Sequence, residues 1–127
     1  MTETELLQYF TATFPDVQIQ SVHGNHFCFI GDERKMPFAT IVCSDEYDQF
    51  SDLDRPGVYR LNLGVGQATF ESLLAGSPAE PDFTVLDQWL PHPVYGSMRW
   101  ISVLNPGEKT WGEAQAAIAE SHARAIR

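Results

Sequence analysis

The sequence predicts a single α+β domain of two layers, with a mainly antiparallel sheet of about five strands, helices at both termini and a short middle helix. The chain of 127 residues has the usual size of one domain, and 43% of it is hydrophobic, enough for one core. Apolar residues recur at helical spacing near both termini and form short strand-like runs between them. No repeat or linker divides the chain, so we expect one domain over residues 1–127.

The first predicted element is a helix over residues 3–13. Thr2 and Glu5 have the spacing of a capping box, in which each side chain binds the backbone N–H of the other residue. The segment Pro15-Asp16 ends the helix, because proline cannot continue it.

Three strands are predicted next. Residues 17–22 predict a strand that is apolar on one face, and residues 26–30 form an apolar run. His23-Gly24-Asn25 supplies turn chemistry between them, so the two segments predict a hairpin. Residues 38–43 form a third strand-like run. Pro37 stands just before it, where a missing N–H is tolerated.

An acid-rich loop, residues 44–54, follows the third strand and is the most unusual feature of the chain. Arg55-Pro56-Gly57 predicts a type II turn that closes it, and residues 58–63 predict a fourth strand. Gly64-Val65-Gly66 leads into a short amphipathic helix around Phe70. These glycines lack the third glycine of a phosphate-binding loop, so we interpret them as a tight turn.

A surface loop, residues 77–82, precedes a segment in which Pro91 and Pro93 are expected to exclude regular structure around His92. The run 100–104 is rich in apolar and β-branched residues and predicts a fifth strand.

The last predicted element is a helix after the turn Asn105-Pro106-Gly107. Thr110 and Glu113 have the spacing of a second capping box. Arg124 and Arg127 lie near the negative end of its dipole, where cations are favourable.

The charge of the chain disfavours nucleic acid as a partner. Its formal net charge is -9, with only eight lysines and arginines, and phosphate contacts need clustered basic residues. Arg34 and Lys35 are adjacent, which we interpret as a solvated turn. No run reaches the roughly 18 apolar residues of a membrane span, and no signal segment is evident, so we expect a cytoplasmic protein without a membrane partner.

The cysteines and histidines predict neither a disulfide nor a metal centre. Cys28 and Cys43 each lie in an apolar run, where a thiol packs as a small hydrophobe. His23 and His26 form a close pair without a third ligand at zinc-like spacing. We therefore expect no metal and no cofactor.

The first candidate site is the acid-rich loop. A calcium-loop register from Asp52 fails, because Pro56 takes a ligand position and Leu63 stands where a bidentate glutamate is required. Two interpretations remain: a solvated loop that caps its own backbone, or one wall of a binding cleft. The candidate residues of the cleft wall are Asp45, Asp48, Asp52 and Asp54, with Arg55 and Arg60 as their cationic partners.

The second candidate is Pro91-His92-Pro93-Val94-Tyr95-Gly96. Its two prolines restrict the backbone around a titratable ring, and Tyr95 and Trp100 lie close in sequence. His92 is either a rigidly presented ligand contact or general base, or a histidine bound to a loop carbonyl.

Four segments together resemble an uncharacterised bacterial domain-of-unknown-function family, and the resemblance covers nearly the whole chain. They are Pro37-Phe38-Ala39-Thr40, Ser51-Asp52-Leu53-Asp54-Arg55-Pro56-Gly57, Arg60-Leu61-Asn62-Leu63-Gly64-Val65-Gly66 and Pro91-His92-Pro93-Val94-Tyr95-Gly96. The resemblance implies no activity.

The C-terminal pattern Trp100-Ile101-Ser102-Val103-Leu104, followed by a helix that contains Glu120-Ser121, more distantly resembles the MmcQ/YjbR-like group. That resemblance implies a small α+β fold and a DNA-binding module. The net charge opposes the second implication.

We expect an intracellular binding or interaction domain, with a cleft between the acidic loop and the His92 loop that accepts a small molecule or a protein. The first alternative is a small enzyme that uses His92 and one of the four loop aspartates as an acid-base pair. The second is an MmcQ/YjbR-like DNA-binding module. The absence of an assembled nucleophile in the sequence favours binding over catalysis.

Overall fold

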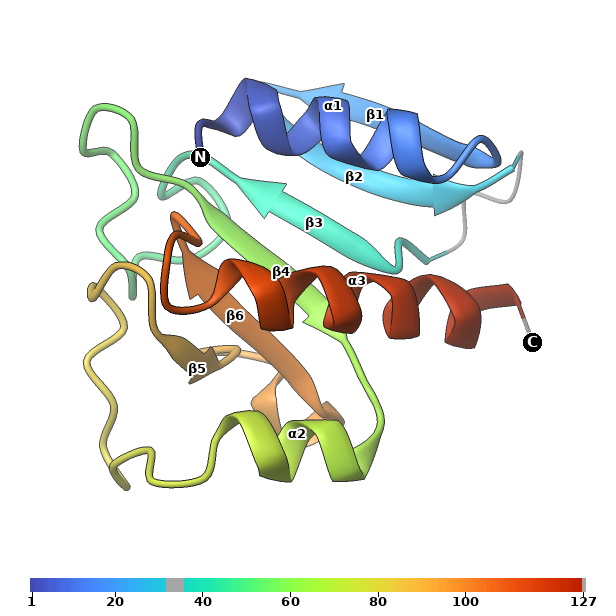
Figure 1. The fold of residues 1–127 in the computed structure, drawn as a ribbon. Coiled ribbons are helices and arrows are strands. Elements are labelled where there is room, and N and C mark those ends of the chain that lie inside the picture. Colours follow the sequence, from blue (N-terminus) through green and yellow to red (C-terminus); the bar gives the residue numbers. More distant parts are fainter. Residues whose placement is uncertain (32–35, 127) are drawn as a thin grey trace.

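The computed structural model describes residues 1–31 and 36–126, so the predictions for Arg34, Lys35 and Arg127 lie outside the described residues. Figure 1 shows the arrangement of the elements. In chain order they are α1 (Glu3–Thr13), β1 (Val17–Val22), β2 (Asn25–Ile30), β3 (Ala39–Val42), β4 (Arg60–Gly64), α2 (Gln67–Leu73), β5 (Trp89–Pro91), the 3-10 helix η1 (Gly96–Met98), β6 (Trp100–Leu104) and α3 (Trp111–Ile126).

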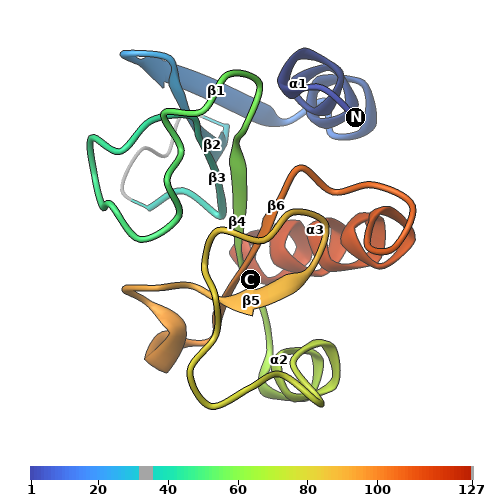
Figure 2. The ribbon, with the colours of Figure 1, turned by 90° about the vertical axis from the view of Figure 1, so that its left-hand side faces the viewer.

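The predicted α+β class is confirmed. One sheet has the strand order β1-β2-β3-β4-β6-β5, and each of its neighbouring strands pairs antiparallel. Figure 2 views the sheet from another side: the helices lie on one face, and the loops around residues 44–58 and 92–99 lie on the other. We call these the helix face and the open face.

The sheet has six strands where about five were expected. The additional strand is β5, which pairs with β6 so that Pro91 lies opposite Ile101. The expectation that Pro91 and Pro93 exclude regular structure here is therefore wrong at Pro91. β5 lies at the edge of the sheet, where a residue without an N–H can stand without breaking a second ladder.

The helix face carries the main core. Side chains of α1 and α3 pack there against alternate residues of the strands, and the fully buried members of this layer include Leu6, Phe10, Cys28, Ile41, Leu61, Leu63, Ile101, Val103 and Ile118. The alternation leaves the intervening residues of each strand on the open face. None of the helices in the described ranges is long and apolar enough to cross a bilayer.

The first predicted capping box is confirmed. The Thr2 hydroxyl accepts from the N–H of Glu5 at 3.1 Å, and the Glu5 carboxylate accepts from the N–H of Thr2 at 2.9 Å. Both donors would otherwise lack a partner at the start of α1.

The second predicted capping box is not formed between the described side chains. The Thr110 hydroxyl donates to Asp87 at 2.7 Å, and Glu113 instead accepts from the indole N–H of Trp89 at 3.1 Å. Asp87 also accepts from the N–H groups of Gly107, Lys109 and Thr110. The donors of the turn before α3 thus have as their acceptor a carboxylate 23 residues from Thr110. The local spacing of residues in the sequence cannot show such a contact.

Replacing Asp87 with alanine should destabilise the protein, because four donors before α3 lose their acceptor. We expect a loss of about 2 kcal/mol in the free energy of unfolding, the usual scale for hydrogen bonds to a charged group. Urea denaturation of Asp87→Ala measures it. Asp82→Ala is the control, since Asp82 is exposed and, among the described residues, accepts only from Thr84. Equal stability of the two variants would contradict the assignment.

Candidate functional site

A row of polar side chains crosses the centre of the open face. Thr40, Asn62 and Ser102 stand opposite one another on β3, β4 and β6. The Asn62 amide donates to the Thr40 hydroxyl at 2.9 Å, and the Ser102 hydroxyl donates to the Asn62 carbonyl at 2.7 Å. Asn62 and Ser102 are buried, so these bonds supply the partners that water would otherwise provide.

Arg60 lies next to this row and forms a buried ion pair with Asp48 of the acidic loop. Its terminal nitrogens donate to the two carboxylate oxygens at 2.6 and 3.0 Å, and the side chains are only 1% and 7% exposed. Other N–H groups of the same guanidinium donate to the Ser51 hydroxyl and to the Asn62 carbonyl. Burial alone would raise the pKa of Asp48, but the hydrogen bonds and charge of Arg60 hold it below its usual value.

The remainder of the acidic loop caps itself. Asp45 accepts from the N–H of Leu53 at 2.9 Å, and Asp54 accepts from the N–H of Asp45 at 3.1 Å. Leu53 is buried in a second small core beneath the loop. The sequence left two interpretations of the loop, a self-capping loop or the wall of a cleft. The hydrogen bonds of Asp45 and Asp54 agree with the self-capping one.

Arg55 fixes the end of the loop by donating to backbone carbonyls. It binds the carbonyls of Ser51, Asp52 and Thr84 at 2.8 to 3.0 Å. The Asp52 carboxylate is exposed and lies 3.6 Å from Arg55, which makes it a weak surface pair.

A cavity of about 320 Å³ opens on the same face, beyond the polar row. Its walls are almost entirely apolar, and its lining residues are Phe27, Met36, Pro37, Thr40, His92, Tyr95, Met98 and Trp100. Phe27 and Thr40 form the floor, because they stand opposite each other on β2 and β3. The segment that follows β5 supplies the opposite wall.

His92 lies in this wall with a fixed tautomer. Its Nδ1 accepts from the N–H groups of Val94 and Tyr95, each at 3.0 Å, so the proton of the neutral ring is on Nε2. Burial and, after it, the positive charge of Arg60 lower the pKa of His92 to about 4, although the charge of Asp48 partly opposes them. At neutral pH the ring is therefore an uncharged donor.

Trp100 forms another part of the wall and depends on the absence of a side chain at Gly64. The two residues stand opposite each other on β6 and β4, and a Cβ at Gly64 would lie only 3.1 Å from the indole ring. Tyr95 and Trp100 both contact His92, with ring centroids 4.9 and 6.4 Å apart.

The structure brings together three of the nine candidate residues at the cavity: His92, Tyr95 and Trp100. Arg60 and Asp48 lie buried beside the polar row. Asp45, Asp54 and Arg55 form hydrogen bonds that hold the loop, while the Asp52 carboxylate is exposed. None of residues 44–54 of the acidic loop lines the cavity, although Tyr47 packs edge-on against the lining residue Phe27 with centroids 5.8 Å apart.

Sequence reasoning missed Phe27, Thr40, Pro37, Met36 and Met98 as cavity residues. A usable signal existed for the first two, because alternation along each strand assigns them to the face opposite Cys28 and Ile41. That they face one cavity follows only from the pairing of β2 with β3.

The geometry gives the His/Asp acid-base pair no support. The Nδ1 of His92 is occupied by two backbone donors, and Asp48 is occupied by Arg60. Among the described residues, no hydrogen bond joins His92 to a carboxylate.

The Gly64-Val65-Gly66 turn binds a carboxylate of the chain itself. Glu120 of α3 accepts from the N–H of Gly66 at 2.7 Å and from the Thr69 hydroxyl at 2.5 Å. Glu120 thus caps the start of α2, which agrees with the interpretation of the glycines as a structural turn.

Comparison with known proteins identifies a family and no activity. A family model described as a family of unknown function, DUF6194, matches residues 1–127. Searches of curated proteins and of solved structures returned no match. The resemblance to a domain of unknown function is confirmed, while bacterial origin and the MmcQ/YjbR-like relation stay predictions.

Replacing Asp48 with asparagine should be strongly destabilising at neutral pH, because it leaves the buried charge of Arg60 without a counterion. We expect a loss of about 3–5 kcal/mol in the free energy of unfolding. Asp52→Asn, on the same loop but exposed, is the control and should change stability by less than about 1 kcal/mol.

The same pair predicts a pH dependence. Because the folded pKa of Asp48 is lowered, its stabilisation is complete above the unfolded value near 3.8 and is lost as pH falls through the folded pKa. Urea titrations across this acidic range should show a flatter profile for Asp48→Asn than for the parent chain. Parallel profiles would show that Asp48 does not titrate differently in the folded state.

Proposed function

We propose that this chain, which belongs to the DUF6194 family, binds a small, planar, largely apolar molecule that carries a hydrogen-bond acceptor. The observation that carries the proposal is the cavity on the open face, whose lining is largely apolar and includes two residues that can donate a hydrogen bond, His92 and Thr40. The family description assigns no activity, so the proposal rests on geometry alone.

The size and walls of the cavity suit a fragment-sized ring system. Its volume of about 320 Å³ lies near the lower end of ligand pockets. Three aromatic rings, those of Phe27, Tyr95 and Trp100, can pack against a planar ligand. Met36 and Met98 lie at the exposed rim, and their flexible thioethers can adapt to its outline.

Both polar groups of the lining can donate. Both hydrogen bonds that the His92 ring makes to described residues use Nδ1, so its Nε2–H has no acceptor among them. The Thr40 oxygen already accepts from Asn62, and within the described ranges its O–H has no acceptor. A ligand that presents a carbonyl oxygen to these two donors would satisfy them.

Apolar exposure at the rim supports a binding surface. Met36, Val94, Tyr95 and Met98 are all exposed, although the chain as a whole is strongly charged. Contiguous exposed apolar groups on a soluble domain commonly mark an interaction site. We do not extend the proposal to nucleic acid, because the net charge is -9.

Acetophenone and ethylbenzene form a matched pair of probes, since acetophenone has a carbonyl group where ethylbenzene has a methylene group. Titration of each into ¹⁵N-labelled protein should shift the amide signals of Phe27 and Thr40 and the indole signal of Trp100. Acetophenone should bind about fivefold more tightly, the equivalent of one net hydrogen bond. Absence of localised shifts with both probes would overturn the proposal.

Tyr95→Ala should weaken the binding of acetophenone severalfold, because it removes one wall of the cavity. Phe50→Ala is the matched control: the two aromatic side chains are 52% and 54% exposed, but Phe50 does not line this cavity. Equal effects of the two substitutions would place the binding elsewhere.

A further inference from the structure

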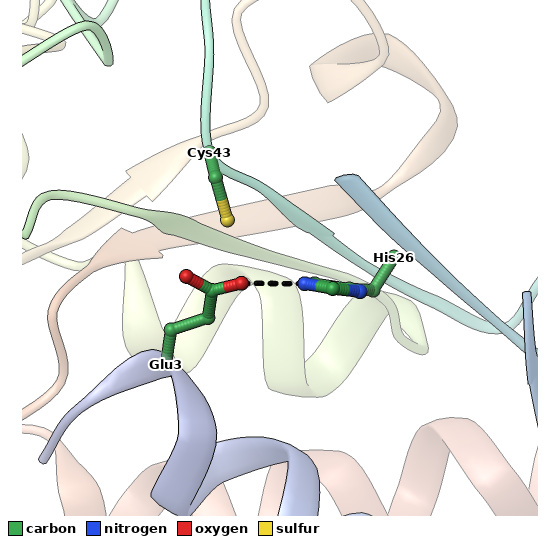
Figure 3. A group of neighbouring side chains, drawn as sticks. All are labelled: Glu3, His26 and Cys43. Carbon is green, nitrogen blue, oxygen red and sulfur yellow. Dashed lines mark hydrogen bonds and ion pairs between the residues drawn. The ribbon is translucent and has the colours of Figure 1, made fainter. Parts of the chain in front are cut away.

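At one end of the helix face, three side chains from separate elements meet: Glu3 of α1, His26 of β2 and Cys43, which follows β3 (Figure 3). Each offers one ligand atom, and these atoms all lie within 4.8 Å of one another. We propose that Glu3, His26 and Cys43 form a binding site for a divalent transition metal of the zinc class. This site is separate from the cavity on the open face.

The donor set matches the chemistry of such an ion. Thiolate sulfur, imidazole nitrogen and carboxylate oxygen are the three ligand types that zinc takes in proteins. Calcium and magnesium prefer sites made of oxygen alone. Three protein ligands leave a fourth position of a tetrahedral ion for water or a bound molecule.

His26 is already oriented as a metal ligand. Its Nδ1 lies 2.6 Å from the Ser21 hydroxyl, and its Nε2 lies 2.5 Å from a carboxylate oxygen of Glu3. A hydrogen bond from one ring nitrogen to a neighbouring oxygen commonly fixes the tautomer that presents the other nitrogen to a metal. The Ser21 hydroxyl can support His26 in this way, because it lies beside Nδ1 and leaves Nε2 to face the metal position.

Cys43 is held by its backbone. Asn25, which is fully buried, accepts from the N–H of Cys43 at 2.7 Å, and its amide nitrogen donates to the Ser44 hydroxyl and to Glu46. The thiol thereby keeps its place beside Glu3, as Figure 3 shows. The carboxylate of Glu3 is 39% exposed, so it can adjust to an ion while His26 stays fixed.

The cluster can be reached from solvent. Glu3 and Cys43 line a separate surface cavity of about 520 Å³, together with residues of the turn after the acidic loop. This opening gives an ion an entry path and leaves room for a fourth ligand.

A cysteine protease-like arrangement is a poorer description of the same residues. The Nε2 of His26 faces Glu3, and Nδ1 faces Ser21, so neither nitrogen is free to accept the thiol proton. Burial, together with the charge of Glu3 and a hydrogen bond to it, raises the pKa of the Cys43 thiol to about 12. A nucleophilic cysteine needs the opposite shift.

The expectation of no metal rested on the spacing of possible ligands in the sequence. The three residues of this cluster do not follow any recognisable metal-binding spacing. Its ligands are 17 to 40 positions apart and come from three elements. Each one, however, continues an apolar stripe. Glu3 precedes Leu6 and Phe10 on α1. His26 lies two residues before Cys28 in β2, and Cys43 lies two residues after Ile41, just past β3, so each shares the face of that core residue.

Cobalt(II) reports the site directly. Added to untagged, EDTA-treated protein, CoCl₂ should produce a thiolate-to-cobalt charge-transfer band and intense visible bands of a tetrahedral ion at one equivalent, and ZnCl₂ should bleach both. Cys43→Ser should abolish the charge-transfer band, whereas Cys28→Ala, which removes the other cysteine, should keep it. No thiolate band in the parent chain, or a band that persists in Cys43→Ser, would overturn the proposal.

Zinc affinity separates ligands from supporting residues. Ser21→Ala should weaken zinc binding roughly tenfold, as the loss of a supporting hydrogen bond does. Glu3→Gln and His26→Gln should weaken it more, while His23→Gln, at an exposed neighbouring histidine, should leave it unchanged. Circular dichroism of Glu3→Gln verifies the fold. Unchanged affinity in folded Glu3→Gln would remove Glu3 from the site and contradict the proposal.

Discussion

The buried ion pair between Arg60 and Asp48 is the interaction on which the open face depends. Arg60 is the first residue of the central strand β4, and its side chain is buried, so an unpaired charge there would be very costly. Asp48 neutralises it and so anchors the acidic loop across the sheet. Arg60 also binds Asn62, which organises the row from Thr40 to Ser102. The charge of Arg60 therefore positions both the acidic loop and the polar row, which reaches the cavity at Thr40.

The same charge affects the chemistry of the cavity wall. Burial and the nearby guanidinium keep His92 neutral, and the two backbone donors at Nδ1 leave its proton on Nε2. A ring held in this way is suited to donating a hydrogen bond and poorly suited to accepting a proton at neutral pH. This contrast is why we propose recognition of an acceptor-bearing molecule and not acid-base catalysis.

The two faces of the sheet carry different chemistry because alternate residues of each strand are directed to opposite sides. The helix face holds the apolar core, which ends at Glu3, His26 and Cys43. The open face carries the polar row and the apolar cavity. Three of the candidate residues from the sequence, His92, Tyr95 and Trp100, line this cavity, although Pro91 lies in β5 and not in a loop. The acidic loop was conspicuous in the sequence, but its charges are largely used to hold the loop together.

The sequence by itself determined the helices, five of the strands and the first capping box, because periodicity and capping act over a few residues. Tertiary structure decided the rest. The pairing of Arg60 with Asp48, the capping of α3 by Asp87 and the meeting of Glu3 with His26 and Cys43 join residues far apart in the chain. Such contacts depend on strand register and on how helices dock, which local patterns do not encode.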